Sequence, residues 1–257
     1  NQDRVLSLYE IKDEQEYRIL EQAREMAGAD DTRQQTALAI AATRADIICL
    51  QEVDNIESLN AFEYGYLFKM VGQGYRQKYT TAGNDSRGID VGIMMREQTA
   101  DGQLIEFVRM TSHAHHTFEE FGLYSPELGE LGEKPYERIF RRDYLEIDVK
   151  IGGVPLTIYI VHQKSMGSPR NGISGRDITM PVRIAEASAT RRIIEDRFGK
   201  DHASNKRWVI CGDFNDYYER LVITGDQFSG YAFEPVVESQ SSLNVLLRDG
   251  FAENLVA

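Results

Sequence analysis

Residues 46–53 read Asp-Ile-Ile-Cys-Leu-Gln-Glu-Val, a short apolar run that stops at an acidic residue. Its β-branched and apolar residues favour a buried strand. Because side chains alternate along a strand, Ile48, Leu50 and Glu52 are expected on one face, with the carboxylate ending an apolar row. A carboxylate there is costly without a hydrogen-bond network, a metal or a ligand, so Glu52 is a candidate site residue.

Two later runs end in the same manner. Residues 154–162 place an apolar row before His162, and residues 207–214 place Cys211 before Asp213. One polar residue at a strand end is usually an ordinary solvated or hydrogen-bonded side chain. Three such ends in one chain favour a shared functional site.

The remaining pattern predicts an α/β (α+β) chain. Strands are expected at residues 89–95, 104–109 and 143–151, and Gly152-Gly153 predicts a hairpin because consecutive glycines supply positive φ angles. Antiparallel neighbours with a few helices indicate two sheets with helices outside, and a doubly wound parallel sheet is the alternative.

Helices are expected at residues 14–27 and 33–45, the second with Leu38, Ala41 and Ala45 on one face. A third is expected from Pro181, a residue suited to a first helical turn, to Phe198, with Gly199 as its cap. Residues 168–175 are predicted to form a loop, and residues 111–136 an irregular insertion whose glutamates face solvent.

Composition narrows the class of protein. The 257 residues are 42% hydrophobic and 27% charged, which is typical of a folded domain and excludes disorder. No apolar run approaches the roughly 18 residues of a membrane span, and the start at Asn1 shows no signal peptide, so soluble, secreted and periplasmic locations stay open. Cys49 and Cys211 lie in apolar runs and are predicted to be buried free thiols.

The net charge of −12 argues against a nonspecific coat for nucleic acid. Residues 162–192 nevertheless carry six cations against two acidic residues. They form either a rim that attracts a phosphorylated substrate or an ordinary solvated helix face; the second interpretation is favoured for Arg191 and Arg192. The His113-Ala114-His115-His116 run lacks the spacing of a dedicated transition-metal site.

Five segments, in this order, resemble motifs of the endonuclease/exonuclease/phosphatase superfamily, which includes pancreatic-type deoxyribonucleases, abasic-site endonucleases, inositol-phosphate phosphatases and bacterial sphingomyelinases. They are Leu50-Gln51-Glu52-Val53, residues 87–93, residues 140–146, His162-Gln163-Lys164-Ser165 and Gly212-Asp213-Phe214-Asn215-Asp216. The resemblance runs from about residue 36 to the end of the chain and implies a four-layer α/β sandwich, two mainly antiparallel β-sheets packed face to face with helices outside.

The same resemblance implies a set of catalytic residues. Glu52 would be the carboxylate ligand of Mg²⁺, with Mn²⁺ or Ca²⁺ as substitutes, since Mg²⁺ takes hard oxygen ligands and keeps several waters. Asp213 would orient or deprotonate the attacking water, and Asn215 would fix that geometry and donate to phosphate oxygens. His162 would hydrogen-bond the scissile phosphate and add positive charge.

Further residues of these motifs and of the basic segment at residues 162–192 are assigned to substrate binding or to support of the site. Lys164, Arg170 and Arg87 are expected to bind substrate, and Asp90 and Gln51 to support the site. No protein partner is indicated.

The chain departs from the family pattern at both ends. The family's closing Asp-His pair has no counterpart after Asp213, so residues 1–257 are interpreted as a single domain that lacks its C-terminal strands. Residues 4–10 are either the first strand, with Glu10 where the family has Asn, or a helix that follows a lost first strand; the helix is slightly favoured.

Three functions follow from these observations. The leading hypothesis is a Mg²⁺-dependent phosphodiester hydrolase, a nuclease that cleaves DNA. The second keeps the fold but takes small phosphorylated metabolites, phosphoinositides or phospholipids as substrate. The third is a catalytically silent module that binds phosphorylated ligands or a protein.

Overall fold

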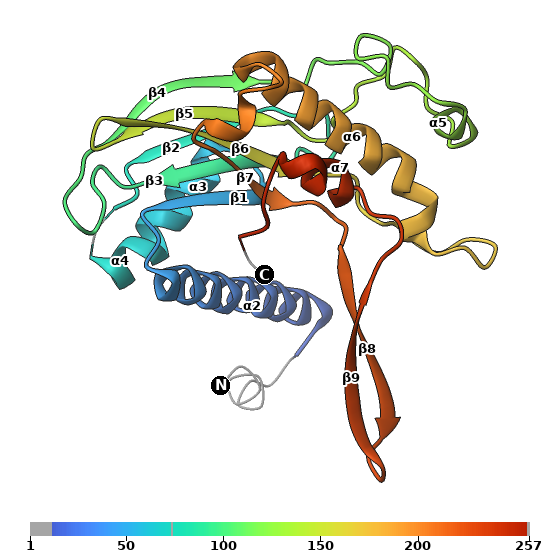
Figure 1. Cartoon of the computed structure of the whole chain (residues 1–257). Helices are drawn as coiled ribbons and strands as arrows, with labels where there is room; N and C mark the ends of the chain where they lie inside the picture. The colour runs from blue at the N-terminus through green and yellow to red at the C-terminus, as the bar shows by residue number, and fades with distance from the viewer. Residues whose placement is uncertain (1–11, 73, 256–257) are drawn as a thin grey trace.

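The computed structural model describes residues 12–72 and 74–255 (Figure 1). Its strands are β1 (Ile47–Val53), β2 (Gln77–Thr81), β3 (Asp90–Met95), β4 (Ile105–Ser112), β5 (Leu145–Ile151), β6 (Val154–His162), β7 (Trp208–Asp213), β8 (Glu219–Asp226) and β9 (Gly230–Val237). Its helices are α2 (Glu14–Thr43), α3 (Ile56–Phe62), α4 (Phe68–Val71), α5 (Pro126–Glu130), α6 (Gly175–Phe198) and α7 (Leu243–Leu247), with the short segments η1 (Glu63–Leu67), η2 (Ala203–Asn205) and η3 (Arg248–Gly250). The segment at residues 4–10, expected as a strand or a helix, lies outside the described residues.

Two sheets form the body of the molecule. The first has the antiparallel order β1-β3-β2, and the second has the order β4-β5-β6-β7, in which only the β6–β7 pair is parallel. Gly152 and Gly153 join β5 to β6 with φ angles of 57° and 82° and place Ile151 opposite Val154. The predicted hairpin is therefore confirmed.

The sheets pack face to face through one apolar cluster. Ile93 and Met95 of β3 lie against Ile147 of β5 and Ile158 of β6. These residues occupy alternate positions, because successive side chains of a strand point to opposite faces of the sheet. The opposite face of each sheet is therefore left to pack against helices.

Helices cover both outer faces. Ala37 of α2 and Leu59 of α3 pack against Met94 of the first sheet. On the other side, Val182 of α6 belongs to the cluster that buries Tyr159 of β6. The order helix, sheet, sheet, helix in Figure 1 confirms the predicted α/β sandwich.

Two of the predicted helices are a single helix. α2 runs without a break through Gly28, and Arg44 ends it with a left-handed φ of 54°. One glycine costs a helix only about 1 kcal/mol, which is too little to end it when the residues on both sides are helical. The expected apolar face is also displaced, because Leu38 is 57% exposed while Ala37 is buried.

The start of α6 differs from the prediction as well. The helix begins at Gly175 and contains Pro181 in its interior, because Ser174 supplies an earlier cap by accepting a hydrogen bond from the Asp177 amide at 3.1 Å. Its predicted end is confirmed, since Gly199 caps the helix by donating its amide hydrogen to Glu195 at 2.8 Å.

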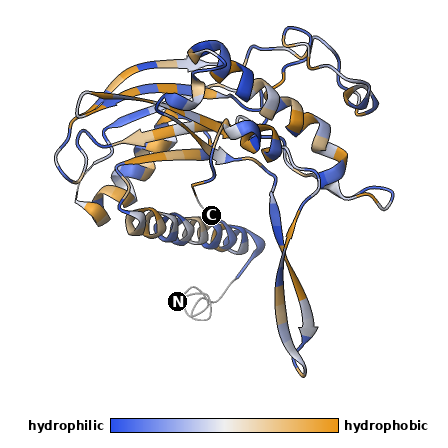
Figure 2. Ribbon diagram, in the orientation of Figure 1, coloured by the Kyte–Doolittle hydropathy of each residue, from blue (hydrophilic) through white to orange (hydrophobic). Residues whose placement is uncertain are grey.

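β8 and β9 form a hairpin that projects from the sandwich (Figure 1). Ile223 and Phe233 face each other on one side of it and are more than half exposed, and Figure 2 shows apolar residues along both strands. These strands and β2 were not predicted from the sequence. None of the described helices is long and apolar enough to cross a bilayer.

Candidate active site

The end of β1 contains a bulge at Glu52. Gln51 pairs with Val91 and Val53 pairs with Asp90, so Glu52 has no partner in the ladder, and its φ is 60°. The prediction that Glu52 continues the apolar row of Ile48 and Leu50 is therefore wrong, because the bulge interrupts the alternation of side chains. A non-glycine residue in the left-handed region is uncommon and accumulates at functional sites. The bulge leaves the carboxylate exposed at the sheet end.

His162 and Asp213 lie side by side at the ends of β6 and β7. They are register partners in the parallel pair, with Nε2 of His162 4.0 Å from a carboxylate oxygen of Asp213. The glycine before Asp213 permits this approach: Gly212 has a φ of 145°, and a Cβ there would lie 2.0 Å from the carbonyl oxygen of Val161. The imidazole is buried, whereas the Asp213 side chain is 53% exposed.

Asn215 also has a positive φ, of 49°. Its backbone amide donates a hydrogen bond to the Asp213 carboxylate at 2.7 Å, and its side-chain nitrogen donates to the carbonyl oxygen of Gln163 at 2.9 Å. These two bonds connect the loop after β7 to the end of β6.

The electrostatic surroundings of His162 favour its neutral form. Burial lowers the pKa of His162, the charge of Arg142 lowers it further, and the carboxylates of Asp213, Glu52 and Asp85 act in the opposite direction. His162 is thus placed to donate a hydrogen bond, while fixed positive charge comes from the neighbouring arginines. The charges of Glu52 and Asp213 both reach this imidazole, and β1 contacts β6 and β7, so the three strand ends lie at one end of the sandwich.

The loop between β2 and β3 brings Arg87 to the same end of the sandwich. Arg87 donates through Nε and Nη2 to the two oxygens of Asp85, at 3.0 and 2.8 Å. These bonds, with the charge of Arg142 as a further contribution, hold the pKa of Asp85 well below its usual range. Asp90 supports the loop by accepting a 2.7 Å hydrogen bond from the amide of Gly83.

The other residues predicted to bind or support are placed differently. Lys164 is half-buried directly after β6, whereas Arg170 is on an exposed turn closed by two 3.0 Å backbone bonds with Ile173. Arg170 lines none of the cavities that contain Glu52, His162 or Lys164. Gln51 is half-buried beside Glu52, and within the described chain its Nε2 has no hydrogen-bond partner.

Most cations of the basic segment are paired inside the protein. Arg191 pairs with Glu195 at 2.7 Å, Arg192 donates to the carbonyl oxygen of Phe121, and Arg176 and Arg183 are buried. Arg176 and Arg191 are thus balanced by carboxylates, whereas Arg183 and Arg192 donate to carbonyl oxygens and keep their charge. Arg191 is ion-paired, as the favoured interpretation expects, but its side chain is only 14% exposed and is not part of a solvated face.

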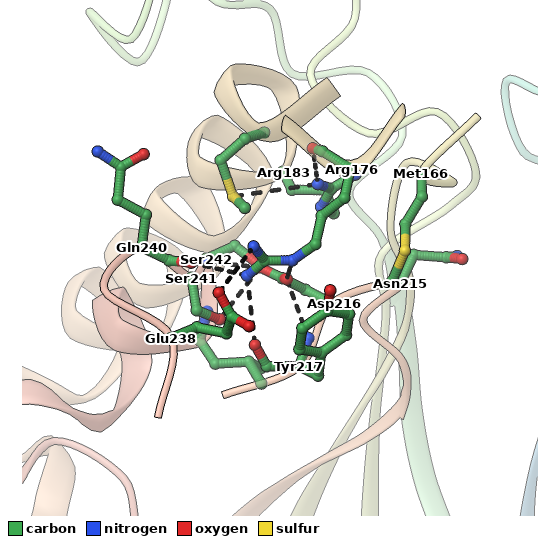
Figure 3. A network of polar contacts seen from close by, with 12 residues as sticks. Met166, Arg176, Arg183, Asn215, Asp216, Tyr217, Glu238, Gln240, Ser241 and Ser242 are labelled. Atoms are coloured by element: carbon green, nitrogen blue, oxygen red, sulfur yellow. Dashed lines mark hydrogen bonds and ion pairs between the residues drawn. The ribbon is translucent and has the colours of Figure 1, made fainter. Parts of the chain in front are cut away.

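A buried ionic network lies next to the loop that follows β7 (Figure 3). Arg176, at the start of α6, donates to Asp216 at 2.7 Å and to the carbonyl oxygen of Gln240 at 2.7 Å. The other oxygen of Asp216 accepts bonds from the Ser242 amide at 2.7 Å and the Ser241 hydroxyl at 3.1 Å. Asp216 thereby fixes the backbone next to Asn215 on one side and the base of the β8–β9 hairpin on the other.

A second buried carboxylate, Glu186 of α6, holds two loops of the site. It has no exposed surface and accepts the amide hydrogens of Arg141 at 3.2 Å and Lys164 at 2.7 Å. Burial raises the pKa of Glu186 to about 7. Neither Glu186 nor Arg142 was predicted to be a site residue, although Arg142 lies in the motif at residues 140–146 and Glu186 in the basic segment.

The donor set suits a magnesium ion better than a closed metal site. Among residues 12–72 and 74–255, no three His, Cys, Asp or Glu side chains form a group that could hold a metal ion. Mg²⁺ needs only one or two carboxylates because waters and substrate oxygens supply its other ligands. The exposed carboxylate of Glu52 fits that mode. The histidines of residues 113–116 make other contacts: Nδ1 of His113 lies 3.4 Å from Nε2 of His116, and Nε2 of His113 lies 3.1 Å from a carboxylate oxygen of Glu146.

Cys49 and Cys211 are free, as predicted, but both are half-buried, whereas buried thiols were expected. They face each other across the two sheets, one on β1 and one on β7. A hydrogen bond with Cys211 and burial raise the pKa of the Cys49 thiol.

Three solved structures illustrate the similarity to known proteins. They are TDP2 from Caenorhabditis elegans (13% identity, 71% of this chain and 41% of that one, TM-score 0.41), D. rerio TDP2 complexed with a single-strand DNA product (15%, 72% and 54%, TM-score 0.39) and SmcL (15%, 71% and 56%, TM-score 0.41). The chain thus spans about half the length of these proteins. No curated protein sequence matches it significantly.

The family assignment rests on the sequence itself. Residues 20–233 match the model of the Endonuclease/Exonuclease/phosphatase family, which covers all three strand ends of the site. Hydrolysis of phosphate esters, the enzyme class predicted from the sequence, is the class of this family. The chain belongs to the endonuclease/exonuclease/phosphatase family.

Proposed function

We propose that this protein is a divalent-metal-dependent phosphodiesterase that cleaves DNA. The observation that carries the proposal is the 4.0 Å approach of the buried His162 imidazole to the exposed Asp213 carboxylate, at the end of the sandwich where Glu52 also lies. A buried donor beside an accessible base is the arrangement required to position a phosphate and activate water.

The residues divide the work as follows. Asp213 accepts the proton of the attacking water, and the hydrogen bond from the Asn215 amide holds its carboxylate in place. His162 donates a hydrogen bond to a phosphate oxygen where negative charge accumulates. No protein nucleophile is required, because water attacks phosphorus in line with the leaving oxygen.

Glu52 would hold Mg²⁺, which supplies charge neutralisation at the phosphate when it is bound. The bulge at Glu52 keeps the carboxylate outside the ladder and exposed. Gln51 and Asp90 support this end of β1 and β3. Lys164, Arg87 and Arg170 are proposed to contact the substrate.

A small phosphorylated metabolite, phosphoinositide or phospholipid headgroup is the second candidate substrate. It is favoured by the net charge of −12 and by the pairing of Arg176, Arg183, Arg191 and Arg192 within the protein, which leaves little positive surface for a long polyanion.

The test compares plasmid DNA with small phosphomonoesters and phosphodiesters in the presence of Mg²⁺ and of a chelator. We expect plasmid nicking that the chelator abolishes and that Glu52→Ala and Asp213→Ala both remove. Asp196→Ala, an exposed aspartate of α6, is the matched control and should nick normally. Hydrolysis of the small compounds alone would favour the second candidate, and binding without any hydrolysis would favour a silent module.

A further inference from the structure

A cavity of about 400 Å³ opens beside the catalytic strand ends. Three separate segments line it: residues 84–87 between β2 and β3, residues 141–142 before β5, and residues 164–165 after β6. Each segment is adjacent in sequence to a strand of the sandwich, so the cavity walls are built on the same sheet ends as the site.

The walls of this cavity are cationic. Arg87, Arg141, Arg142 and Lys164 contribute four positive charges, against the single acidic lining residue Asp85. Lys164 differs from the arginines because no described residue accepts a hydrogen bond from its Nζ. Arg141 is paired outside the lining with Glu133. The cavity therefore has more positive charge than its own acidic group can balance.

Arg142 is a fixed element of the wall and not a mobile surface arginine. Its side chain is only 6% exposed, its Nε lies 3.1 Å from Asp85, and its Nη1 donates to the carbonyl oxygen of Gln163 at 3.1 Å. Burying a guanidinium is costly unless it is paired, and here both contacts hold it between the cavity and His162.

The other walls are held by buried polar groups. Glu186 accepts the amides of Arg141 and Lys164, so a single carboxylate sets the separation of two walls. Asn84 ties the third wall to the carbonyl oxygen of Phe140 at 2.9 Å. Preorganised cations lose less entropy on binding an anion than flexible ones do.

The cavity adjoins the end of β6, because Arg142 in its wall donates to the carbonyl oxygen of Gln163, the residue after His162. Arg142 lowers the pKa of His162, and Glu52 contributes to the raised pKa of Arg87. A phosphate at His162 would therefore lie next to the cavity, yet the scissile group cannot occupy both places.

We propose that this cavity binds a second, non-scissile phosphoryl group of the substrate, so that the preferred substrates carry two phosphoryl groups on neighbouring positions. The inference rests on the proposed phosphodiesterase function. Arginine forks and a lysine ammonium are the side chains that bind phosphoryl oxygens most strongly. Arg170, which is outside the cavity, takes no part in this subsite.

Binding measurements test the subsite independently of catalysis. Isothermal titration with thymidine 5′-monophosphate and thymidine 3′,5′-bisphosphate is made on the whole chain and on Lys164→Ala. We expect the bisphosphate to bind the wild type roughly tenfold or more tightly than the monophosphate, as charge-assisted hydrogen bonds allow, and Lys164→Ala to lose most of that preference. Lys206→Ala, an exposed lysine outside this cavity, should keep it.

Catalysis supplies the second measurement. A thymidine dinucleotide is compared with the same dinucleotide bearing a terminal 5′ or 3′ phosphate, and kcat/KM should rise for one of the phosphorylated forms in the wild type but not in Lys164→Ala. Equal binding of the two mononucleotides, or a preference that Lys164→Ala retains, would overturn the inference even if the enzyme is active. Preference for the bisphosphate without cleavage of any diester would support the subsite and contradict the proposed function.

Discussion

The site contains two pairs of carboxylates that differ in exposure. Glu52 and Asp213 are exposed and form its mouth, whereas Asp216 and Glu186 are buried and belong to the ionic layer behind it. Asp213 is half exposed and accepts one protein hydrogen bond, whereas Asp216, three residues later, is buried and satisfied by Arg176, Ser241 and Ser242. Glu52 and Glu186 repeat the contrast, the first exposed on a bulge and the second without exposed surface.

This contrast separates groups that act from groups that hold them. A carboxylate whose oxygens already accept hydrogen bonds from the protein cannot bind water, metal or phosphate as well. Its removal leaves the buried donors without hydrogen-bond partners, which destabilises the fold. A carboxylate with free oxygens contributes little to folding and can bind a ligand. Substitutions in the mouth should therefore affect activity alone, and substitutions in the layer should affect stability first.

The largest effect is expected from Glu52→Ala or Asp213→Ala. Each removes a group with a direct role at the phosphate, so phosphodiester hydrolysis should fall by at least about 10²–10³-fold. The free energy of unfolding in urea should change by less than about 1 kcal/mol, because Glu52 is exposed and Asp213 accepts a single hydrogen bond from the described residues 12–72 and 74–255. A large loss of stability in both variants would contradict the claim that the exposed carboxylates contribute little to folding.

Asp216→Ala should show the reverse balance. It leaves Arg176 buried beside unpaired serine groups, and loss of one member of a buried ion pair costs about 3–5 kcal/mol. Ser241→Ala is the graded control, because it removes the hydrogen bond to Asp216 and the one accepted from the Leu243 amide, each worth about 1 kcal/mol. Urea unfolding of the three proteins checks the ranking, and equal stability of wild type and Asp216→Ala would contradict it.

The pH dependence of stability should report on Glu186. Burial raises its pKa to about 7 in the folded state, above the ordinary value of 4.5, so the folded state binds the proton more tightly. The contribution is complete below about pH 4.5 and is lost as the pH rises through about 7, up to roughly 3 kcal/mol. Comparing unfolding free energies across that range with Glu186→Gln isolates the effect. Parallel curves for the two proteins would show that Glu186 titrates normally.

The smallest effect is expected in the hairpin, outside both regions. Ile223→Thr on β8 changes a side chain that is 58% exposed, so the unfolding free energy should shift by no more than about 0.5 kcal/mol. Ile160→Ala on β6, fully buried between the sheets, should cost about 2–5 kcal/mol. A comparable loss in the hairpin variant would mean that its apolar face is covered in solution.

Much of the sandwich could be predicted from local pattern. β6 was predicted with its observed bounds, and the Gly152-Gly153 turn was identified, because alternation and positive φ are properties of short segments. β2 was missed because its Gln-Lys-Tyr-Thr-Thr sequence lacks an apolar row. The two helices predicted before β1 are one, since a helix end depends on its cap more than on a single glycine.

The sequence by itself determined which residues stand at the strand ends, because the apolar runs that stop at Glu52, His162 and Asp213 are local patterns. Only the tertiary structure decided how those residues are used. The bulge at Glu52, the ion pair of Arg176 with Asp216 and the burial of Glu186 all depend on partners from distant segments. Periodicity is encoded locally, whereas the charge, exposure and pKa of a side chain are set by its neighbours in space.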